Sequence, residues 1–274
     1  MPIVASMYFV RFILLWVICL LPHAALTQSA ETPVEVTPLA GWRVNATTHM
    51  AAFQVRLGDG WKTYWRAPGD AGIPPRIIWS ETSNVHSATF IWPTPEVFYI
   101  AGTRSIGYHD GVTLPLELTV SDPGQDAVIA GTLELGVCEE ICIPVSIPFE
   151  LSLSASQNQR VATITAALVD QPLSAVEASM ERPSCAIEPF DDGLRITAEF
   201  ELPKGQLPET IVIEANDPDI WVSSPALTHE AGKVTAAAEL LHLDGGAFAL
   251  DRSALRFTVF GLGHAVDLHG CRPG

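Results

Sequence analysis

Residues 131–151 read GTLELGVCEEICIPVSIPFEL, and apolar and polar side chains alternate along both halves of this segment. Successive side chains of a β-strand point to opposite faces. One face of the first half carries Leu133, Leu135 and Val137. One face of the second half carries Ile143, Val145, Ile147, Phe149 and Leu151. The stretch therefore predicts a β-hairpin with one apolar face, and it places Cys138 and Cys142 together on the opposite, polar face.

Three residues separate the two cysteines, which suits a short hairpin loop with the cysteines as the closing cross-strand pair. Opposed Cα atoms in an antiparallel pair lie roughly 4.5 to 5.5 Å apart, within the span of about 4.4 to 6.8 Å that a disulfide accepts. A Cys138–Cys142 bond constrains the unfolded chain little, because the loop is so short. The pattern favours a redox pair and leaves two alternatives open: a surface staple, or a soft-metal site that His109 approaches through the fold.

Glu139 and Glu140 lie between the cysteines, and negative charge beside a thiol disfavours the thiolate. We therefore expect the thiol pKa of the reduced pair to lie at or above the ordinary value. Such a dithiol reacts mainly when a docked partner supplies the attacking thiolate or changes the local field. The expected chemistry is a mixed disulfide between the partner and one cysteine, resolved by the other cysteine, and the sequence does not assign these two roles.

Outside the cysteine hairpin, residues 31–154 read as short strands separated by turn residues, the pattern of an all-β sandwich. Alternation over 53–57 and 61–65, on either side of the turn signal Asp59-Gly60, predicts another hairpin. Further strands are expected at 76–79, 88–92, 113–120, 128–137 and 143–153.

A long connection at residues 93–111 reads PTPEVFYIAGTRSIGYHDG. Its aromatic residues Phe98, Tyr99 and Tyr108 are too apolar for a loop that only meets water. We therefore expect this connection to fold back onto the protein, with one or two strands packed into the core as the alternative.

The composition changes after the first domain. Residues 158–171 place Val161, Ile164 and Leu168 at helical spacing, and Pro172 ends the pattern. Beyond this boundary helix, strand patterns occur at 194–200, 210–215, 233–241 and 254–260. We therefore expect a second, smaller β-sandwich domain over residues 155–274, with the helix leading it.

Cys185 and Cys271 remain as a possible second pair, one near the start of this second domain and one near the end of the chain. A bond between them closes a loop of roughly 85 residues, which contributes about 4 to 5 kcal/mol in the chain-entropy model. We therefore expect a structural disulfide, with free thiols, a second redox pair or a site with His269 as the alternatives.

The amino-terminal residues read as a secretory signal peptide, because one positive charge precedes the apolar run FILLWVICLLP at 12–22. Small residues favour cleavage after Thr27. Cleavage removes Cys19 and leaves an even number of cysteines, as an oxidising compartment favours. A lipoprotein anchored through Cys19 is the alternative. No later stretch is apolar enough to span a bilayer, so we expect any membrane partner to be a separate chain.

The chain is acidic, with a formal net charge of −16 that becomes −17 once the signal peptide and its single arginine are removed. This charge argues against binding to nucleic acid. A mature chain of this length exceeds the usual size of one small domain, which agrees with the two expected domains.

Four motifs occur in order along the first domain: GWKTYWRAPGDAGIPPRIIW at 60–79, VFYIAG, GYHDGVTLPLEL, and GVCEEICIPV at 136–145. Together they resemble the amino-terminal periplasmic domain of the bacterial thiol:disulfide interchange protein DsbD and, more closely, of the related copper-sensitivity suppressor protein ScsB. The combination is specific, although each motif alone is weak. The resemblance implies an immunoglobulin-like β-sandwich in the periplasm of a Gram-negative bacterium.

The resemblance also implies a function and a site. Such domains take electrons from a membrane-embedded donor of the DsbD/CcdA type and pass them to periplasmic thioredoxin-like or disulfide isomerase proteins, with no cofactor. Carried over, Cys138 and Cys142 become the catalytic redox pair, Phe98 and Tyr99 become a cap that shields them, and Tyr64 becomes an aromatic neighbour of the site.

Two departures from the family pattern bear on this interpretation. The cysteines of DsbD stand further apart, which leaves the cap geometry and the redox potential open here. The membrane segments and the thioredoxin-like domain of the full-length proteins have no counterpart in this sequence, so we expect one link of a relay. The alternative function is a non-catalytic adaptor, for copper handling or protein binding, whose cysteines form a structural disulfide.

Overall fold

The computed structural model describes residues 33–69, 72–100, 102–202, 207–230 and 232–274. The expected signal peptide, with Cys19, lies outside the described residues. Residues 33–274 form one compact unit built almost entirely of β-strands, which confirms the all-β fold class. In the described part of the chain, no helix has the length and apolar character needed to cross a membrane.

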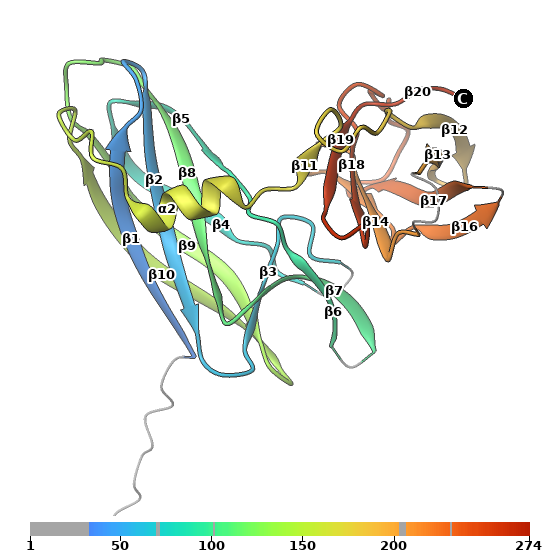
Figure 1. Cartoon of the computed structure of the whole chain (residues 1–274), viewed down its shortest axis with the longest axis horizontal. Helices are drawn as coiled ribbons and strands as arrows, with labels where there is room; N and C mark the ends of the chain where they lie inside the picture. Colours follow the sequence, from blue (N-terminus) through green and yellow to red (C-terminus); the bar gives the residue numbers. More distant parts are fainter. Residues whose placement is uncertain (1–32, 70–71, 101, 203–206, 231) are drawn as a thin grey trace, which may run out of the picture. The chain divides into compact units, whose positions relative to one another are not determined.

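The first β-sandwich consists of two sheets whose strands all pair antiparallel (Figure 1). One sheet has the order β1 (Val34–Arg43), β2 (Thr48–Leu57), β8 (Gly111–Val120), β5 (Val85–Phe90). The other has the order β10 (Cys142–Leu153), β9 (Ala127–Cys138), β3 (Lys62–Tyr64), β7 (Thr103–His109), β6 (Glu96–Ile100), and β4 (Arg76–Ser83) pairs with β9. Inward side chains such as Phe53, Leu116 and Leu133 form a shared hydrophobic core between the sheets.

The hairpin predicted around Asp59-Gly60 is wrong. Strand β2 pairs with β1 and β8, whereas β3 pairs with β7 and β9, so the chain crosses from one sheet to the other at this turn. Alternating strands and a turn signal look the same in a hairpin and in a sheet-to-sheet connection. The crossing places Lys62, at the start of β3, directly opposite Cys138.

Residues 93–111 contain two strands rather than an irregular loop. Strands β6 and β7 form a hairpin at the edge of the second sheet. Ile106 and Tyr108 of β7 are buried in a hydrophobic cluster, which supports the alternative of strands packed into the core. Phe98 and Tyr108 are therefore buried in this hairpin, whereas Tyr99 is exposed.

A short helix follows the first sandwich, as predicted. Helix α2 (Ala162–Val169) buries Ile164 against Trp42 and Met50, which belong to the first sandwich. The helix that we assigned to the second domain thus packs on the first one. The domain boundary at residue 155 stays a prediction.

The second β-sandwich is smaller and also has two sheets. One has the order β11 (Leu173–Ser174), β19 (Val266–His269), β18 (Arg256–Phe260), β14 (Thr210–Glu214). The other has the order β15 (Ile220–Val222), β17 (Lys233–His242), β13 (Gly193–Glu201), β12 (Ser184–Phe190), β20 (Arg272–Pro273), with β16 (Ala226–Glu230) paired to β17. Its core includes Ile196, Phe200 and Phe257.

Candidate functional site

Strands β9 and β10 form the predicted hairpin, and two cysteines close it. Cys138 and Cys142 are directly opposed in the register, their Sγ atoms are bonded, and their Cα atoms lie 4.1 Å apart. The alternation of the sequence and the three-residue loop are sufficient to produce this arrangement, because both cysteines share one face of the hairpin.

The two cysteines differ in their exposure. Leu133 and Val137 lie in the hydrophobic core, so Cys138 occupies the opposite face of β9, as the alternation predicts. Cys138 is nevertheless 0% exposed, whereas Cys142 is an exposed residue. The expectation that both cysteines lie open on a polar face is therefore wrong for Cys138. Segments from elsewhere in the chain cover its end of the face.

The Tyr64 side chain lies over this face of the sheet. It is 1% exposed, and a Cβ atom added at Gly136 would stand 3.0 Å from the Tyr64 ring. The same Cβ would stand 2.8 Å from Ile73, in the segment between β3 and β4. Glycine at position 136, two residues before Cys138, therefore leaves the space that the Tyr64 ring and Ile73 occupy.

The Tyr64 hydroxyl reaches the disulfide. Its oxygen lies 3.0 Å from Cys142 Sγ. A disulfide sulfur carries no hydrogen, so the hydroxyl donates this hydrogen bond. Burial raises the pKa of the Tyr64 hydroxyl above its ordinary value, so the group stays protonated at neutral pH. The structure thus brings together Tyr64 and Cys142, which the sequence resemblance also associated.

Phe98 and Tyr99 point to opposite faces of β6, as successive strand residues do. Phe98 is 8% exposed, and its ring centroid lies 4.9 Å from that of His109. His109 shares the face of the disulfide, because the register aligns it with Lys62 and aligns Lys62 with Cys138. Tyr99 is 64% exposed and belongs to the other face. The register therefore brings Phe98, but not Tyr99, to the cysteine face, and we correct the expected two-residue cap accordingly.

Two exposed isoleucines flank Cys142 in the sequence, and their exposure was not predicted. Ile141 is 76% exposed and Ile143 is 42% exposed, on either side of the exposed cysteine. Glu139 and Glu140 are exposed in the same loop. The exposed apolar surface could have been expected from the isoleucine at the tip of the hairpin loop, where polar residues are usual.

His109 contacts a carboxylate rather than the cysteines. Its Nδ1 atom lies 2.9 Å from an Oε2 atom of Glu96. Over the described ranges, no three or more His, Cys, Asp or Glu side chains gather in a way that could hold a metal ion.

The second cysteine pair lies in the second sandwich. The Sγ atoms of Cys185 and Cys271 are bonded across a sequence separation of 86 residues. Cys185 is 0% exposed and belongs to the core of this sandwich, and Cys271 packs against that core. The bond joins the last residues of the chain to β12, with which β20 also pairs.

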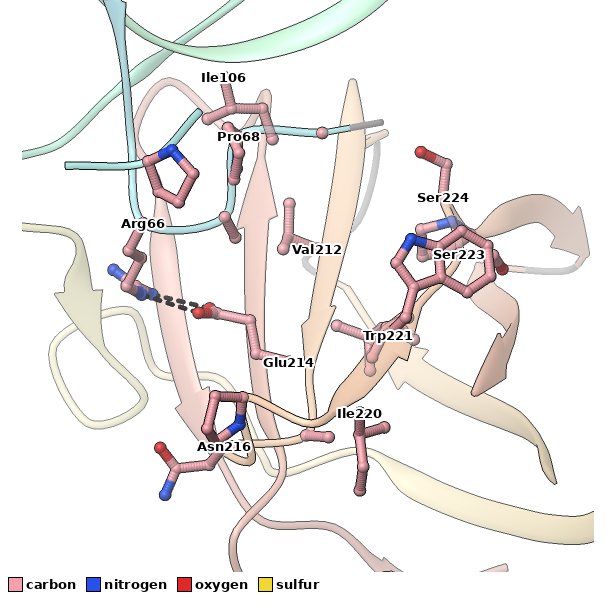
Figure 2. A pocket seen from close by; sticks show the side chains of 18 of the residues that line it. Arg66, Pro68, Ile106, Val212, Glu214, Asn216, Ile220, Trp221, Ser223 and Ser224 are labelled. Carbon is pink, nitrogen blue, oxygen red and sulfur yellow. Dashed lines mark hydrogen bonds and ion pairs between the residues drawn. The ribbon is translucent and has the colours of Figure 1, made fainter. Parts of the chain in front are cut away.

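The two residues after Tyr64 contact the second sandwich. The Trp65 ring centroid lies 5.8 Å from that of Phe260, and Arg66 Nε lies 3.0 Å from an Oε1 atom of Glu214. Figure 2 shows this ion pair at the wall of a cavity of about 570 Å³. Neither residue of the Cys138–Cys142 pair lines the cavity.

Parts of this chain are similar to known proteins. Residues 30–153 match the family described as "Thiol:disulfide interchange protein DsbD, N-terminal". The N-terminal periplasmic domain of ScsB from Proteus mirabilis is similar in structure, with a TM-score of 0.63 and 23% identity over 91% of this chain and 97% of that chain. The reduced DsbD N-terminal domain of Neisseria meningitidis matches with a TM-score of 0.25 and 18% identity over 43% of this chain and 85% of that chain. A search of curated proteins finds no significant match.

Proposed function

We propose that this protein is a thiol:disulfide exchange module of the bacterial periplasm, because residues 30–153 match the family of DsbD amino-terminal domains. It takes two electrons from a membrane-embedded donor and passes them to periplasmic thioredoxin-like or disulfide isomerase proteins. Cys138 and Cys142 are the reacting pair. The observation that carries the proposal is a bonded cysteine pair with one exposed member and one buried member.

This asymmetry divides the roles between the cysteines. A thiolate of the donor reaches the exposed Cys142 Sγ and attacks it, the Cys138–Cys142 bond breaks, and Cys138 leaves as a thiolate. The second donor thiol then attacks the donor sulfur of the mixed disulfide. The donor becomes a disulfide, and the protein becomes a dithiol.

Electron delivery follows the reverse course with a different partner. The Cys142 thiolate attacks the disulfide of an acceptor and forms a mixed disulfide, and one acceptor sulfur leaves as a thiolate. The Cys138 thiolate then attacks Cys142 Sγ and releases the acceptor as a dithiol. No cofactor enters these steps, because the two electrons move with the sulfur–sulfur bonds.

Two neighbours support the same division of roles. Tyr64 donates a hydrogen bond to Cys142 Sγ, and this bond becomes stronger when Cys142 carries negative charge as a thiolate. Ile141, in the loop before Cys142, offers exposed apolar surface that a partner can bury when its own sulfur approaches.

Trapping tests the proposal. The probe is a thioredoxin-fold protein whose single active-site cysteine carries a thionitrobenzoate leaving group. The C138A variant keeps the exposed Cys142 thiol, so we expect it to form the mixed disulfide at least about tenfold faster than C142A does, because only its thiol is accessible. Mass spectrometry identifies the adduct, and release of the leaving group gives the rate.

The double variant C138A/C142A is the control and is expected to give no adduct. If neither single variant forms an adduct, the exchange function is wrong, and the disulfide is a staple of a non-catalytic adaptor. Faster trapping by C142A would keep the exchange function and reverse the two roles.

A further inference from the structure

We propose that Lys62 is the charge partner of the Cys138 thiolate. This inference rests on the proposed function, because the thiolate exists only while the Cys138–Cys142 bond is open. It adds a positioning residue to the site, from a strand that is distant in sequence from the cysteine hairpin.

The register of four strands carries the inference. Cys142 of β10 lies opposite Cys138 of β9, Cys138 lies opposite Lys62 of β3, and Lys62 lies opposite His109 of β7. Directly opposed residues in antiparallel strands project to the same face, with Cβ atoms about 4.5 to 5.5 Å apart. The four side chains therefore form one row across the sheet, with the lysine next to the buried cysteine.

The ammonium group of Lys62 stays at this end of the sheet. Its Nζ atom lies 2.9 Å from the carbonyl oxygen of Gly60. A Cβ atom added at Gly60 would stand 3.5 Å from an Oε1 atom of Glu139, so the loop between the cysteines meets the same turn. The positive charge of Lys62 and the negative charge of Glu139 thus gather at one turn beside Cys138.

A buried thiolate needs such a partner. Cys138 is 0% exposed, and loss of hydration disfavours the charged form of a thiol unless an opposite charge or a hydrogen bond stabilises it. The exposed Glu139 and Glu140 have the opposite effect to Lys62. Cys138 nevertheless has to accept negative charge each time that Cys142 is attacked, which explains a lysine at the opposed position.

Other polar groups also face the cysteine row from the neighbouring strands and loop. Tyr64 hydrogen bonds to Cys142 Sγ, and the His109 ring is held by Glu96. Glu134, on the same face of β9, forms an ion pair with Arg76, with an N–O distance of 2.7 Å. Arg76 is therefore already paired with a carboxylate, and the His109 ring contacts Glu96, whereas the Nζ atom of Lys62 contacts a neutral carbonyl oxygen.

The exchange step shows what Lys62 does. The partner thiolate forms a bond with Cys142 Sγ, the Cys138–Cys142 bond breaks, and the electron pair of that bond stays on Cys138 Sγ. The negative charge thereby moves from the partner to Cys138. Lys62 stabilises this product electrostatically and takes no electrons.

The test measures the Cys138 thiol in the full chain. In a C142A background, the pH dependence of alkylation of the Cys138 peptide, followed by mass spectrometry, gives the midpoint of thiolate formation. We expect K62M and K62Q to raise this midpoint by about one pH unit, which is a tenfold smaller thiolate fraction below the midpoint. K62R is expected to keep the midpoint of the parent, because it keeps the charge.

Two controls separate charge from structure. K62Q can still donate a hydrogen bond to Gly60, so a purely structural role predicts that Gln behaves as Lys does. K233M removes a lysine of the second sandwich and is expected to leave the midpoint unchanged. A midpoint in K62M and K62Q equal to that of the parent overturns the inference, and unfolding curves of each variant show whether its fold is intact.

The proposed function can fail separately. If the wild-type dithiol does not exchange with thioredoxin-fold proteins while K62M still shifts the midpoint, the function is wrong and the Lys62–Cys138 coupling stands. If exchange proceeds and the midpoint does not move, the function stands and the coupling is wrong.

Discussion

The two disulfides of this chain lie in similar β-sandwiches and differ in almost every property that controls reactivity. Cys138–Cys142 closes a separation of four residues at the end of a hairpin, with Cys142 exposed. Cys185–Cys271 closes a separation of 86 residues and has Cys185 in the core. The first bond adds little to stability and is accessible to a thiolate. The second bond adds much to stability, and neither of its cysteines is exposed, because Cys185 is buried and Cys271 is partly buried.

Loop length and sulfur exposure together distinguish a disulfide that exchanges from one that is structural. Bond formation alone does not separate them, since both pairs are bonded.

Removal of the second disulfide is expected to have the largest effect on stability. The C185A/C271A variant should lose about 4 to 5 kcal/mol of unfolding free energy, because its unfolded chain is no longer cross-linked over a long loop. The C138A/C142A variant should lose about 2 kcal/mol or less, from the same relation applied to a short loop. Urea unfolding under oxidising conditions measures both losses. Equal losses of unfolding free energy would show that loop length does not distinguish the two disulfides.

An ion pair in the second sandwich gives the next effect. Asp267 is 13% exposed and accepts a hydrogen bond of 2.8 Å from Arg256 Nε. Burial alone would raise the pKa of Asp267, but the hydrogen bonds and charge of Arg256 outweigh burial and lower it. The ionised carboxylate is therefore favoured in the folded protein. Its stabilisation is present above the unfolded pKa of about 3.9 and is lost as the pH falls through the lower folded pKa.

The D267N variant should accordingly lose about 1 to 3 kcal/mol at pH 7, and this difference should shrink in acid. Unfolding curves recorded at several pH values measure it. Exchange at Cys138–Cys142 should be unaffected, since the substitution lies in the other sandwich. A stability difference that grows in acid would show that the sign of the pKa argument is wrong.

The smallest effect is expected from a single hydroxyl at the exchange site. Y64F removes the hydrogen bond to Cys142 Sγ and should slow exchange with a thioredoxin-type dithiol about three- to tenfold. Y108F is the matched control, because the buried Tyr108 hydroxyl donates to the carbonyl oxygen of Pro93, 2.9 Å away, rather than to sulfur. Y108F should lower stability by about 1 kcal/mol and leave the exchange rate unchanged. Equal rates in Y64F and the wild type would remove Tyr64 from the site.

The cysteine hairpin could be predicted from the sequence because its information is local. Alternation fixes the faces of two adjacent strands, and three loop residues fix their register. The positions of Tyr64 and Ile73 over Gly136 could not be predicted, because both residues come from a segment more than sixty residues earlier in the chain.

The alignment of Cys138, Lys62 and His109 across the sheet could not be predicted from the sequence either. It depends on the strand order, because β3 pairs with β9 and β7 in the second sheet and not with β2 in the first. The turn Asp59-Gly60 is compatible with a hairpin and with this crossing. The sequence therefore predicted an all-β fold and a candidate cysteine pair, whereas the partners of each sulfur depended on strand order.

Selective reduction distinguishes the exchange disulfide from the structural one. The oxidised protein is incubated, without denaturant, with an excess of a reduced thioredoxin-type dithiol, and the free thiols are alkylated and located by mass spectrometry. The account predicts alkylation at Cys138 and Cys142 and none at Cys185 and Cys271. Alkylation at Cys185 and Cys271 while Cys138 and Cys142 stay bonded would contradict it.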